Sequence, residues 1–373
     1  MNYLKSYKKK KNNIKIFKII VGVFIISMLY EMFGNNKNVL ESDISGENNN
    51  IEKILEESVK NVVGIAKMDS FTNNQYSWGS GVVISKNGYI VTNEHVISKK
   101  DGECFVIVDY NKKLKSKLVW SNADIDLAIL KVDYLFENYS ALGDSDDINI
   151  GENVYAIGNP IGINFYRSIT SGIISAKNRN IEFEENDKKL YLNNLIQTDA
   201  TINEGSSGGA LINKDGQLIG INTIKIASAE SMNFAIPIDV IKPIIKKLEN
   251  GEKFKEQTLG ILGYDKYTIK ETQNNINIDN GIYVAQVNIN SESEKSGIKV
   301  GDIILSVDNN NVETISKLRA IIYEKDNGAY VNLKIKRLNK EFFVKVKLKD
   351  KSWFPYIFLC IYNNILNCNK NLI

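Results

Sequence analysis

The spacing of apolar positions changes several times along the chain, and each change predicts a different kind of segment. From Val62 to Ile241, short apolar runs rich in β-branched residues alternate with turns that contain Gly and Asn. Many short strands at this spacing, with little helix, are typical of an all-β sandwich or barrel. Helical spacing occurs at Ile51–Val59 and returns at Ile238–Leu248. Strands are predicted at residues 81–84, 89–91, 104–108, 127–130 and 154–157.

A second unit begins near Glu256, after a short polar linker at Glu249–Lys255. It has strand-like apolar runs, and Ser316–Glu324 has the spacing of an amphipathic helix. About 90 residues of mixed strand and helix are enough for a small independent domain. The strand-like runs are 281–285, 302–307 and 330–335, and the apolar helix positions are Leu318, Ile321 and Ile322.

The N-terminus carries a long apolar run, Ile19–Phe33, which only Glu31 interrupts. Counting back to Ile14 or Ile16 gives about 18–20 residues, enough for a helix to cross a bilayer. No small-x-small site for signal peptidase follows, so we expect an uncleaved anchor and not a removed signal peptide. Seven lysines precede the run, and the positive-inside rule therefore places residues 1–18 in the cytoplasm and everything after Phe33 outside.

Two further segments flank the predicted domains. Residues 34–50 are rich in Asn, Ser, Gly and Glu, which is typical of a flexible linker. At the other end, residues 350–373 form an apolar and Asn-rich tail whose apolar run, Trp353–Tyr362, is too short to span a membrane and contains Pro355. The sequence leaves open whether this tail lies at the membrane surface, packs on the second unit or is a peripheral extension.

Charge and composition exclude several classes of function. The chain has 373 residues and a net charge of +3, but the seven N-terminal lysines leave a slightly acidic remainder, which argues against nucleic-acid binding. Cys104, Cys360 and Cys368 are too few for a disulfide framework, although Cys360 and Cys368 could pair. With one histidine, no Cys-x-x-Cys and no phosphate-binding loop, we expect no zinc site, no use of ATP and no cofactor.

A histidine, an aspartate and a serine occur in the order and setting that nucleophilic hydrolysis requires. Gly205-Ser206-Ser207-Gly208-Gly209 can place a serine oxygen and backbone N–H groups around one point, His95 is the only histidine, and Asp126 opens an apolar run. A serine hydroxyl is a weak nucleophile, so Ser207 needs His95 as general base. Asp126 would hold the imidazole in the required tautomer. The sequence therefore predicts a serine hydrolase with His95, Asp126 and Ser207 as catalytic residues.

Alternatives exist for two of these assignments. Asp124 lies two residues before Asp126, and Ser206 competes with Ser207 for the role of nucleophile. Asp126 is preferred because it leads the Asp-Leu-Ala run, and Ser207 because it immediately precedes two glycines. Gly205, Ser206 and Ser207 are the predicted donors of an oxyanion hole.

Short motifs surround these residues along the chain, and together they resemble the HtrA/Deg family of serine proteases. Residues 256–349 resemble the PDZ domain that follows such proteases, with Leu259-Gly260-Ile261 as ligand loop and 296–304 as signature turn and strand. At position 206 the family commonly has Asn, and Glu204 adds a negative charge near the site. The protease motifs are Gly79-Ser80-Gly81-Val82-Val83, Thr92-Asn93-Glu94-His95-Val96, Asp126-Leu127-Ala128-Ile129-Leu130, Leu142-Gly143-Asp144-Ser145, Ala156-Ile157-Gly158-Asn159-Pro160, Thr170-Ser171-Gly172-Ile173-Ile174, Gln197-Thr198-Asp199-Ala200 and Asn203-Glu204-Gly205-Ser206-Ser207-Gly208-Gly209.

The resemblance implies a mainly β chain, which follows the cytoplasmic lysine-rich N-terminus and transmembrane anchor already expected at residues 1–33. A chymotrypsin-like double β-barrel protease domain is expected at residues 51–250 and a small α+β PDZ domain at 256–349. The implied substrate-binding residues are Ile202, which would narrow the primary specificity pocket, and the strand Asn222, Thr223, Ile224, Lys225 and Ile226. The implied PDZ peptide-binding residues are Leu259, Gly260, Ile261 and Leu262, beside which a peptide C-terminus would add as a strand. Leu318, Ile321 and Ile322 could line that peptide pocket or simply form the core.

The function expected from this resemblance is that of a membrane-anchored, extracytoplasmic, ATP-independent endopeptidase that cuts misfolded proteins. HtrA-like proteases are commonly trimers, so a homotrimer is expected. Two other functions stay open. One is a PDZ-gated signalling protease with a single dedicated substrate, and the other is a peptide-binding chaperone or scaffold whose triad is idle.

Overall fold

The computed structural model describes residue 28 and residues 50–68, 76–97, 102–109, 111–159, 166–185, 188–225, 231–272 and 276–351. The lysine cluster, nearly all of the predicted anchor, most of the linker and the tail after residue 351 lie outside these ranges. Within them, no helix combines the length and the apolar character needed to cross a membrane. Residues 50–58 are helical, as predicted from their spacing. The described residues from Glu57 onward belong to one compact unit.

Six strands close the first barrel, in the spatial order β1-β2-β3-β6-β5-β4. The strands predicted at 81–84, 89–91, 104–108 and 127–130 are confirmed within β2, β3, β4 and β6, apart from the last residue of the first, which follows β2. The β-branched residues fill the interior: Val63, Ile65, Val83 and Ile90 are almost completely buried. The bounds are β1 Val62–Met68, β2 Tyr76–Val83, β3 Tyr89–Thr92, β4 Cys104–Asp109, β5 Lys112–Asn122 and β6 Leu127–Val132.

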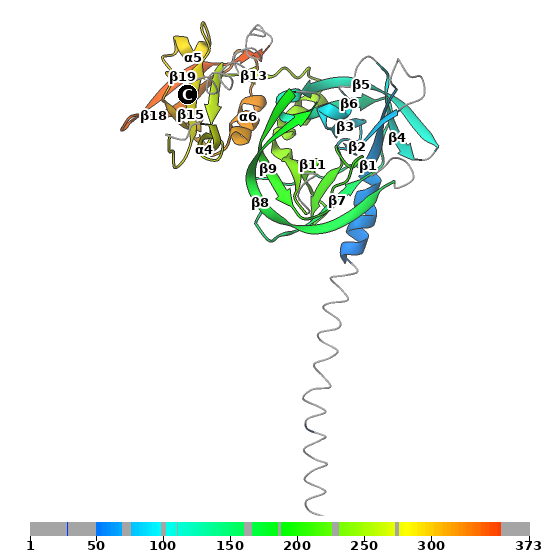
Figure 1. Cartoon of the computed structure of the whole chain (residues 1–373). Helices are drawn as coiled ribbons and strands as arrows, with labels where there is room; N and C mark the ends of the chain where they lie inside the picture. Colours follow the sequence, from blue (N-terminus) through cyan, green and yellow to red (C-terminus); the bar gives the residue numbers. More distant parts are fainter. Residues whose placement is uncertain are drawn as a thin grey trace, which may run out of the picture. The chain divides into compact units, whose positions relative to one another are not determined.

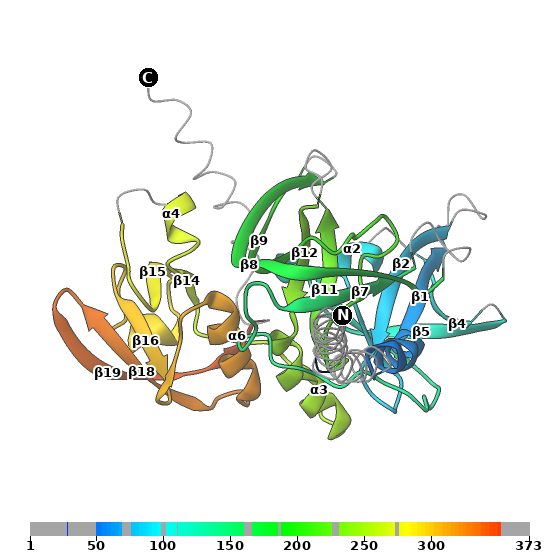
Figure 2. The same cartoon turned by 90° about the horizontal axis from the view of Figure 1, so that it is seen from below.

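A second set of six strands closes another barrel, in the order β10-β11-β12-β9-β8-β7. The two groups of strands can be followed in blue to cyan and in green (Figures 1 and 2). The strand predicted at 154–157 lies in β7, whereas the long strands β8 and β9 were not among the predicted strands. Ile174, Ile196 and Leu211 lie in the core of this barrel. The bounds are β7 Asn153–Gly158, β8 Ser168–Glu185, β9 Lys188–Thr198, β10 Ala210–Asn213, β11 Leu218–Lys225 and β12 Asn233–Pro237.

The continuous helix predicted at Ile238–Leu248 is wrong in detail. The segment consists of a 3-10 turn, η4 Ile238–Val240, followed by α3 Lys242–Glu249. Pro243 lies in the first turn of α3, where a missing N–H breaks no hydrogen bond, so the α-helix begins there and not earlier. The predicted apolar face is nevertheless buried, since Val240, Ile241, Ile244 and Ile245 are all less than 5% exposed.

The C-terminal domain contains a sheet with the strand order β14-β15-β16-β18-β19, to which β17 Asn310–Asn311 adds beside β16. The helix predicted at Ser316–Glu324 is α6 Ile315–Glu324, whose first turn is capped by the Thr314 hydroxyl. Leu318, Ile321 and Ile322 belong to the domain's core, so the core-packing alternative is confirmed for them. The remaining bounds are β13 Gln257–Thr258, β14 Ile261–Tyr264, α4 Ile269–Thr272, β15 Ile282–Val287, α5 Glu292–Lys295, β16 Ile303–Val307, β18 Tyr330–Arg337, β19 Lys340–Lys347 and β20 Lys349–Asp350.

Candidate active site

The first barrel positions His95 and Asp126 at the ends of two neighbouring strands. His95 lies in the short helix α2 Glu94–Ile97, directly after β3, and Asp126 lies directly before β6. Because β3 and β6 pair at Thr92 and Ala128, the two residues are brought together. Asp126 has a left-handed backbone with φ of 50°, and the Asn93 amide donates to its carbonyl oxygen at 3.0 Å. These contacts fix the backbone on which the carboxylate stands.

The imidazole of His95 faces the carboxylate of Asp126. The ring Nδ1 lies 2.9 Å from Oδ1 and 2.8 Å from Oδ2, and the His95 backbone N–H donates to Oδ1 at 3.0 Å. The Thr223 hydroxyl from the second barrel donates to Oδ2 at 2.7 Å. With Asp126 only 6% exposed, these donors replace the water that an ionised carboxylate would otherwise need.

The side chain of Asp124, the alternative partner of His95, bonds Lys351 and not His95. Its side chain is 68% exposed and forms an ion pair with Lys351 at 3.0 Å. Its backbone N–H donates to the Asn122 side chain, which caps the 3-10 turn η2 Ala123–Ile125. The structure therefore pairs His95 with Asp126.

The serine of the second barrel reaches the same place through Thr223. The Ser207 hydroxyl donates to the Thr223 carbonyl at 2.9 Å, while the Thr223 hydroxyl bonds Asp126. Ser207 is partly exposed, whereas Ser206 is 7% exposed and packs against Gly158, where an added Cβ would lie 2.9 Å from the Ser206 hydroxyl. Of the two competing serines, Ser207 is thus the accessible one that is linked to the His95–Asp126 pair.

In the turn around Ser207, some backbone N–H groups are bonded within the protein and others are available to a substrate. Ser206 donates its N–H to the Asn203 carbonyl at 2.9 Å, so it is not available to a substrate, and its predicted place in the oxyanion hole does not fit. The N–H groups of Gly205 and Ser207 have no acceptor in the part of the chain that the structure describes. Gly205 has φ of 88°, a conformation that glycine adopts without strain. Two donors therefore remain for an oxyanion hole.

The predicted substrate-binding residues have different places in the structure. Ile202 is 1% exposed within the core of the second barrel, so it does not line an open pocket as expected. Asn222 is fully buried, and it accepts the Gly208 N–H at 2.8 Å and donates its amide to the Ala210 carbonyl at 2.9 Å, which makes it a support of the serine turn. Thr223 holds the catalytic groups, as described above.

The rest of that strand fits the expectation better. The pairing of β11 with β10 ends at Ile221, so Ile224 and Lys225 extend beyond β10. Backbone groups beyond the end of a neighbouring strand can pair with an added extended chain. Ile226 lies outside the described residues.

The predicted peptide loop of the C-terminal domain lies at a sheet edge. Ile261 and Leu262 belong to β14, the first strand in its sheet order, and both are half-buried. Leu259 is part of the core, and the Gly260 N–H donates to the Thr258 hydroxyl at 3.0 Å. An incoming strand can add beside β14, whereas the Leu259 side chain supports the loop from inside.

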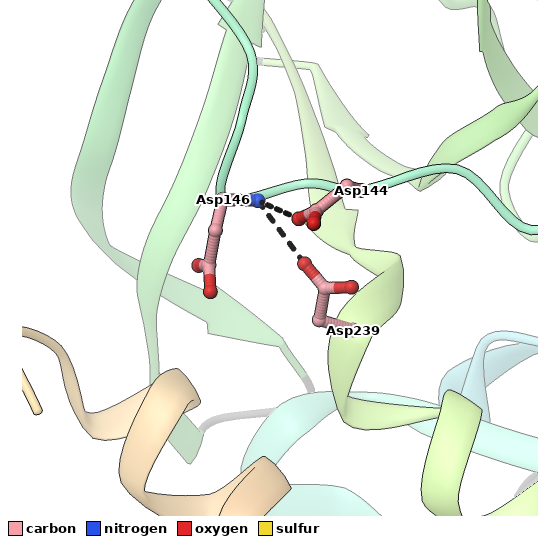
Figure 3. Close-up of side chains that lie close together, drawn as sticks. All are labelled: Asp144, Asp146 and Asp239. Carbon is pink, nitrogen blue, oxygen red and sulfur yellow. Dashed lines mark hydrogen bonds between the residues drawn. The ribbon is translucent and has the colours of Figure 1, made fainter. Parts of the chain in front are cut away.

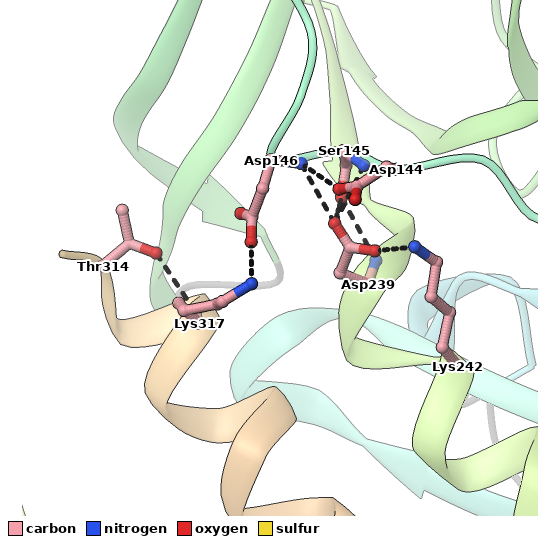
Figure 4. A network of polar contacts seen from close by, with 7 residues as sticks. All are labelled: Asp144, Ser145, Asp146, Asp239, Lys242, Thr314 and Lys317. Atoms are coloured by element: carbon pink, nitrogen blue, oxygen red, sulfur yellow. Dashed lines mark hydrogen bonds and ion pairs between the residues drawn. The ribbon is translucent and has the colours of Figure 1, made fainter. Parts of the chain in front are cut away.

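Three carboxylates lie close together away from this site: Asp144, Asp146 and Asp239 (Figure 3). The Asp146 N–H donates to Asp144 at 3.0 Å and to Asp239 at 3.1 Å. Asp239 also forms an ion pair with Lys242, and Asp146 with Lys317 (Figure 4). Because two lysines already compensate these charges, we assign the cluster to holding a loop and not to binding a metal ion.

Cys104, the one cysteine within the described residues, is an unsuitable nucleophile. Burial raises the pKa of its thiol above the ordinary value, which disfavours the reactive thiolate. Cys360 and Cys368, which could pair or stay free, lie outside the described residues.

Thr223 and Asn93 have positioning roles that the sequence did not predict. Both are almost completely buried polar residues beside apolar strand positions. Buried polar groups normally need partners, so polar residues beside apolar runs were the available signal. Their partner, Asp126, however, lies 97 positions from Thr223 and 33 positions from Asn93 in sequence.

Comparisons with known proteins agree with this geometry. A trypsin-like peptidase domain matches residues 79–221, and a PDZ domain matches residues 265–348. The serine protease Do-like HtrA of Lactobacillus helveticus is 39% identical over 289 residues, which cover 74% of this chain and 69% of that protein. The serine protease Do-like HtrA of Bacillus subtilis (strain 168) is 34% identical over 315 residues, which cover 81% of this chain and 70% of that protein.

Solved structures extend the likeness to the fold. The HtrA-type protease AlgW with a decapeptide has a TM-score of 0.57 at 26% identity, covering 81% of this chain and 98% of that chain. The two closed barrels and the C-terminal sheet are thus a chymotrypsin-like protease fold and a PDZ domain. The chain belongs to the HtrA family of serine proteases, and it is a serine endopeptidase with one PDZ domain.

Proposed function

We propose that His95, Asp126 and Ser207 are the catalytic triad of this endopeptidase. The observation that carries the proposal is the connection of all three groups: Nδ1 of His95 lies 2.8 Å from Asp126, and Thr223 bonds both Asp126 and Ser207. His95 acts as general base, Asp126 orients the ring and stabilises the imidazolium, and Ser207 is the nucleophile.

The reaction begins when the Ser207 hydroxyl leaves the Thr223 carbonyl and turns toward Nε2 of His95. The oxygen attacks the scissile carbonyl as its proton passes to Nε2, and the N–H groups of Gly205 and Ser207 receive the oxyanion. The imidazolium then protonates the leaving amine, which leaves an acyl-enzyme. Water, deprotonated by His95, hydrolyses the ester and regenerates Ser207.

The substrate is an extended, unfolded segment of polypeptide. Support comes from β11, whose residues Ile224 and Lys225 continue past β10 and can pair with a substrate backbone. Folded proteins rarely offer a free extended strand, whereas misfolded ones do. We therefore assign the protein to quality control of misfolded proteins, with no requirement for ATP.

The PDZ domain would bind the C-terminus of a peptide beside β14, residues Ile261–Tyr264. The HtrA-type protease AlgW with a decapeptide, which has a similar fold, supports peptide binding by this chain. A PDZ-gated protease with one dedicated substrate is the second candidate, because the same edge strand could bind a peptide that activates the protease. A scaffold with an idle triad does not fit the paired His95 and Asp126.

The cellular setting follows from the sequence. The apolar run Ile19–Phe33 behind seven lysines supports a single-pass anchor in the cell membrane, with the protease and PDZ domains outside the cytoplasm. The family likeness supports a homotrimer. The domain limits proposed are 1–33 for the cytoplasmic end and anchor, 34–50 for the linker, 51–250 for the protease and 256–349 for the PDZ domain.

Cleavage of unfolded casein by the purified full chain in detergent tests the triad. We expect Ser207→Ala to abolish cleavage. Ser206→Ala should retain most of it, because the Ser206 side chain is buried and does not reach the substrate. Loss of cleavage in Ser206→Ala alone would reverse the assignment of the nucleophile. Casein that stays uncut until a C-terminal peptide is added would favour the gated protease.

A further inference from the structure

Ser80 lies in the first barrel but donates two hydrogen bonds to the serine turn of the second barrel, residues 205–209. It belongs to β2 and is 0% exposed. Its backbone N–H donates to the Ser207 carbonyl at 2.8 Å, and its hydroxyl donates to the Gly205 carbonyl at 2.7 Å. One residue thus holds two carbonyl groups on either side of Ser206, across the junction of the barrels.

The hydroxyl of Ser80 has a single orientation available. A hydroxyl has one proton and two acceptor positions. The Asn159 N–H donates to the Ser80 oxygen at 2.8 Å, and a carbonyl such as that of Gly205 can only accept. The Ser80 proton is therefore directed at Gly205. The Thr92 hydroxyl in turn donates to the Ser80 carbonyl at 2.7 Å, so residue 80 is itself held firmly.

The orientation of the oxyanion donors depends on these bonds. The peptide unit between Gly205 and Ser206 is held at both ends, by Ser80 at its carbonyl and by Asn203 at its N–H. The next unit, which carries the Ser207 N–H, is held only at the Ser206 carbonyl, by the Gly209 N–H at 3.0 Å. The unit after it is held at the Ser207 carbonyl by Ser80. Ser80 thus fixes the units on both sides of a donor that must stay unbonded to receive substrate.

Glycine at position 205 makes such a restraint necessary. A glycine has several backbone conformations of similar energy, so the peptide units beside it can rotate unless their polar groups are bonded. Rotation of the unit after Gly205 would change the path of the backbone that leads to the Ser207 N–H. We propose that Ser80 is a positioning residue for catalysis, whose hydroxyl holds the peptide unit after Gly205 and thereby keeps the Ser207 N–H aimed at the oxyanion.

This inference rests on the proposed triad and oxyanion hole, and it predicts a specific kinetic signature. An oxyanion hole binds the transition state and not the ground state, so its loosening lowers kcat and leaves KM nearly unchanged. Removal of one complete donor typically lowers kcat by about 10²–10³-fold. Because Ser80→Ala loosens the Ser207 donor without deleting it, we expect kcat to fall by about 10–100-fold.

The experiment compares Ser80→Ala with Ser85→Ala in the full chain, with a chromogenic peptide substrate. Ser85 is the matched control, since it is also 0% exposed in the first barrel but its hydroxyl accepts only from the Asn87 N–H near its own turn. Two further affinities are measured: that of a peptide boronic acid, which forms a tetrahedral adduct, and that of uncleaved substrate in a Ser207→Ala background. We expect Ser80→Ala to weaken only the boronic acid, in step with kcat.

Each result has a defined meaning. A kcat for Ser80→Ala within twofold of wild type, or an equal loss in Ser85→Ala, overturns the inference. If Ser80→Ala does not fold, Ser80→Cys replaces it; a thiol is a poor donor, so kcat falls in the same direction, and a wild-type kcat overturns the inference. If Ser207→Ala keeps its activity, the assigned nucleophile is wrong and the role of Ser80 falls with it.

Discussion

Replacement of Thr223 by valine tests how the two barrels cooperate in catalysis. Valine keeps the β-branched shape of threonine in a site that is 3% exposed, but it removes the hydroxyl that donates to Asp126 at 2.7 Å. The Thr223 carbonyl, which receives the Ser207 hydroxyl, belongs to the backbone and is kept. The change therefore removes one bond to the catalytic carboxylate and little else.

The expected loss follows from the charge and burial of Asp126. A hydrogen bond to a charged group contributes about 1.5–3 kcal/mol, which corresponds to about 10–150-fold if it acts wholly in the transition state. Asp126 keeps the His95 backbone N–H and the ring Nδ1 as partners, so its position is only partly loosened. We therefore expect kcat/KM to fall by about 10–30-fold, near the lower limit.

The assay is the steady-state hydrolysis of a peptide by Thr223→Val and by Thr223→Ser, with melting temperatures measured in parallel. Thr223→Ser keeps the hydroxyl and should stay within about threefold of wild type, since it loses only a methyl group. A folded Thr223→Val protein with kcat/KM within twofold of wild type would refute the reasoning, because it would show that Asp126 is held sufficiently by His95 alone.

Two further predictions concern stability. Gly208→Ala should destabilise the protease by about 2–5 kcal/mol, because φ is 84° and the new Cβ would lie 2.0 Å from the Ser80 carbonyl oxygen. Gly151→Ala is its control, with φ of 90° and no atom within 4 Å, and should cost about 1–2 kcal/mol in denaturant unfolding; equal losses would contradict the close approach at Gly208. In the PDZ domain, hydrogen bonds from Lys295 and Lys349 lower the pKa of Glu292 from 4.5 to about 2. This stabilisation is complete above pH 4.5 and lost as the pH falls toward 2, so the advantage of wild type over Glu292→Gln in melting temperature should shrink across that interval; a constant difference would contradict the lowered pKa.

Individual strands and helices show how much of the fold the sequence pattern predicted. The strands at 89–91 and 127–130 were predicted because they are short apolar runs between turns, and both strands exist. The lengths of β8 and β9 were not predicted, although Ile181 and Phe183, which pair with Leu192 and Leu190 across the hairpin, alternate with polar residues and were an available signal. The helix at Ile238–Leu248 was predicted whole because apolar spacing does not register the effect of Pro243 on where hydrogen bonding starts.

The predicted site shows the same division. Ile202 and Asn222 were expected to contact substrate, but both are almost completely buried and support the barrel core and the serine turn. Position along the chain indicated that they lie near the site. It did not indicate which way their side chains are oriented, because that depends on partners from other strands.

The sequence by itself determined the chemistry: a single histidine, an aspartate at the start of an apolar run and a serine between glycines leave few ways to build a hydrolase. It also determined the class of fold, because short β-branched runs have only a few stable ways to bury their apolar faces. Only the tertiary structure decided that Ser206 is buried and Ser207 accessible, that Thr223 joins the two halves of the site, and that Ser80 holds the serine turn. Each of these rests on a hydrogen bond or a packing contact between residues in different parts of the chain, and such contacts leave no local periodicity in the sequence.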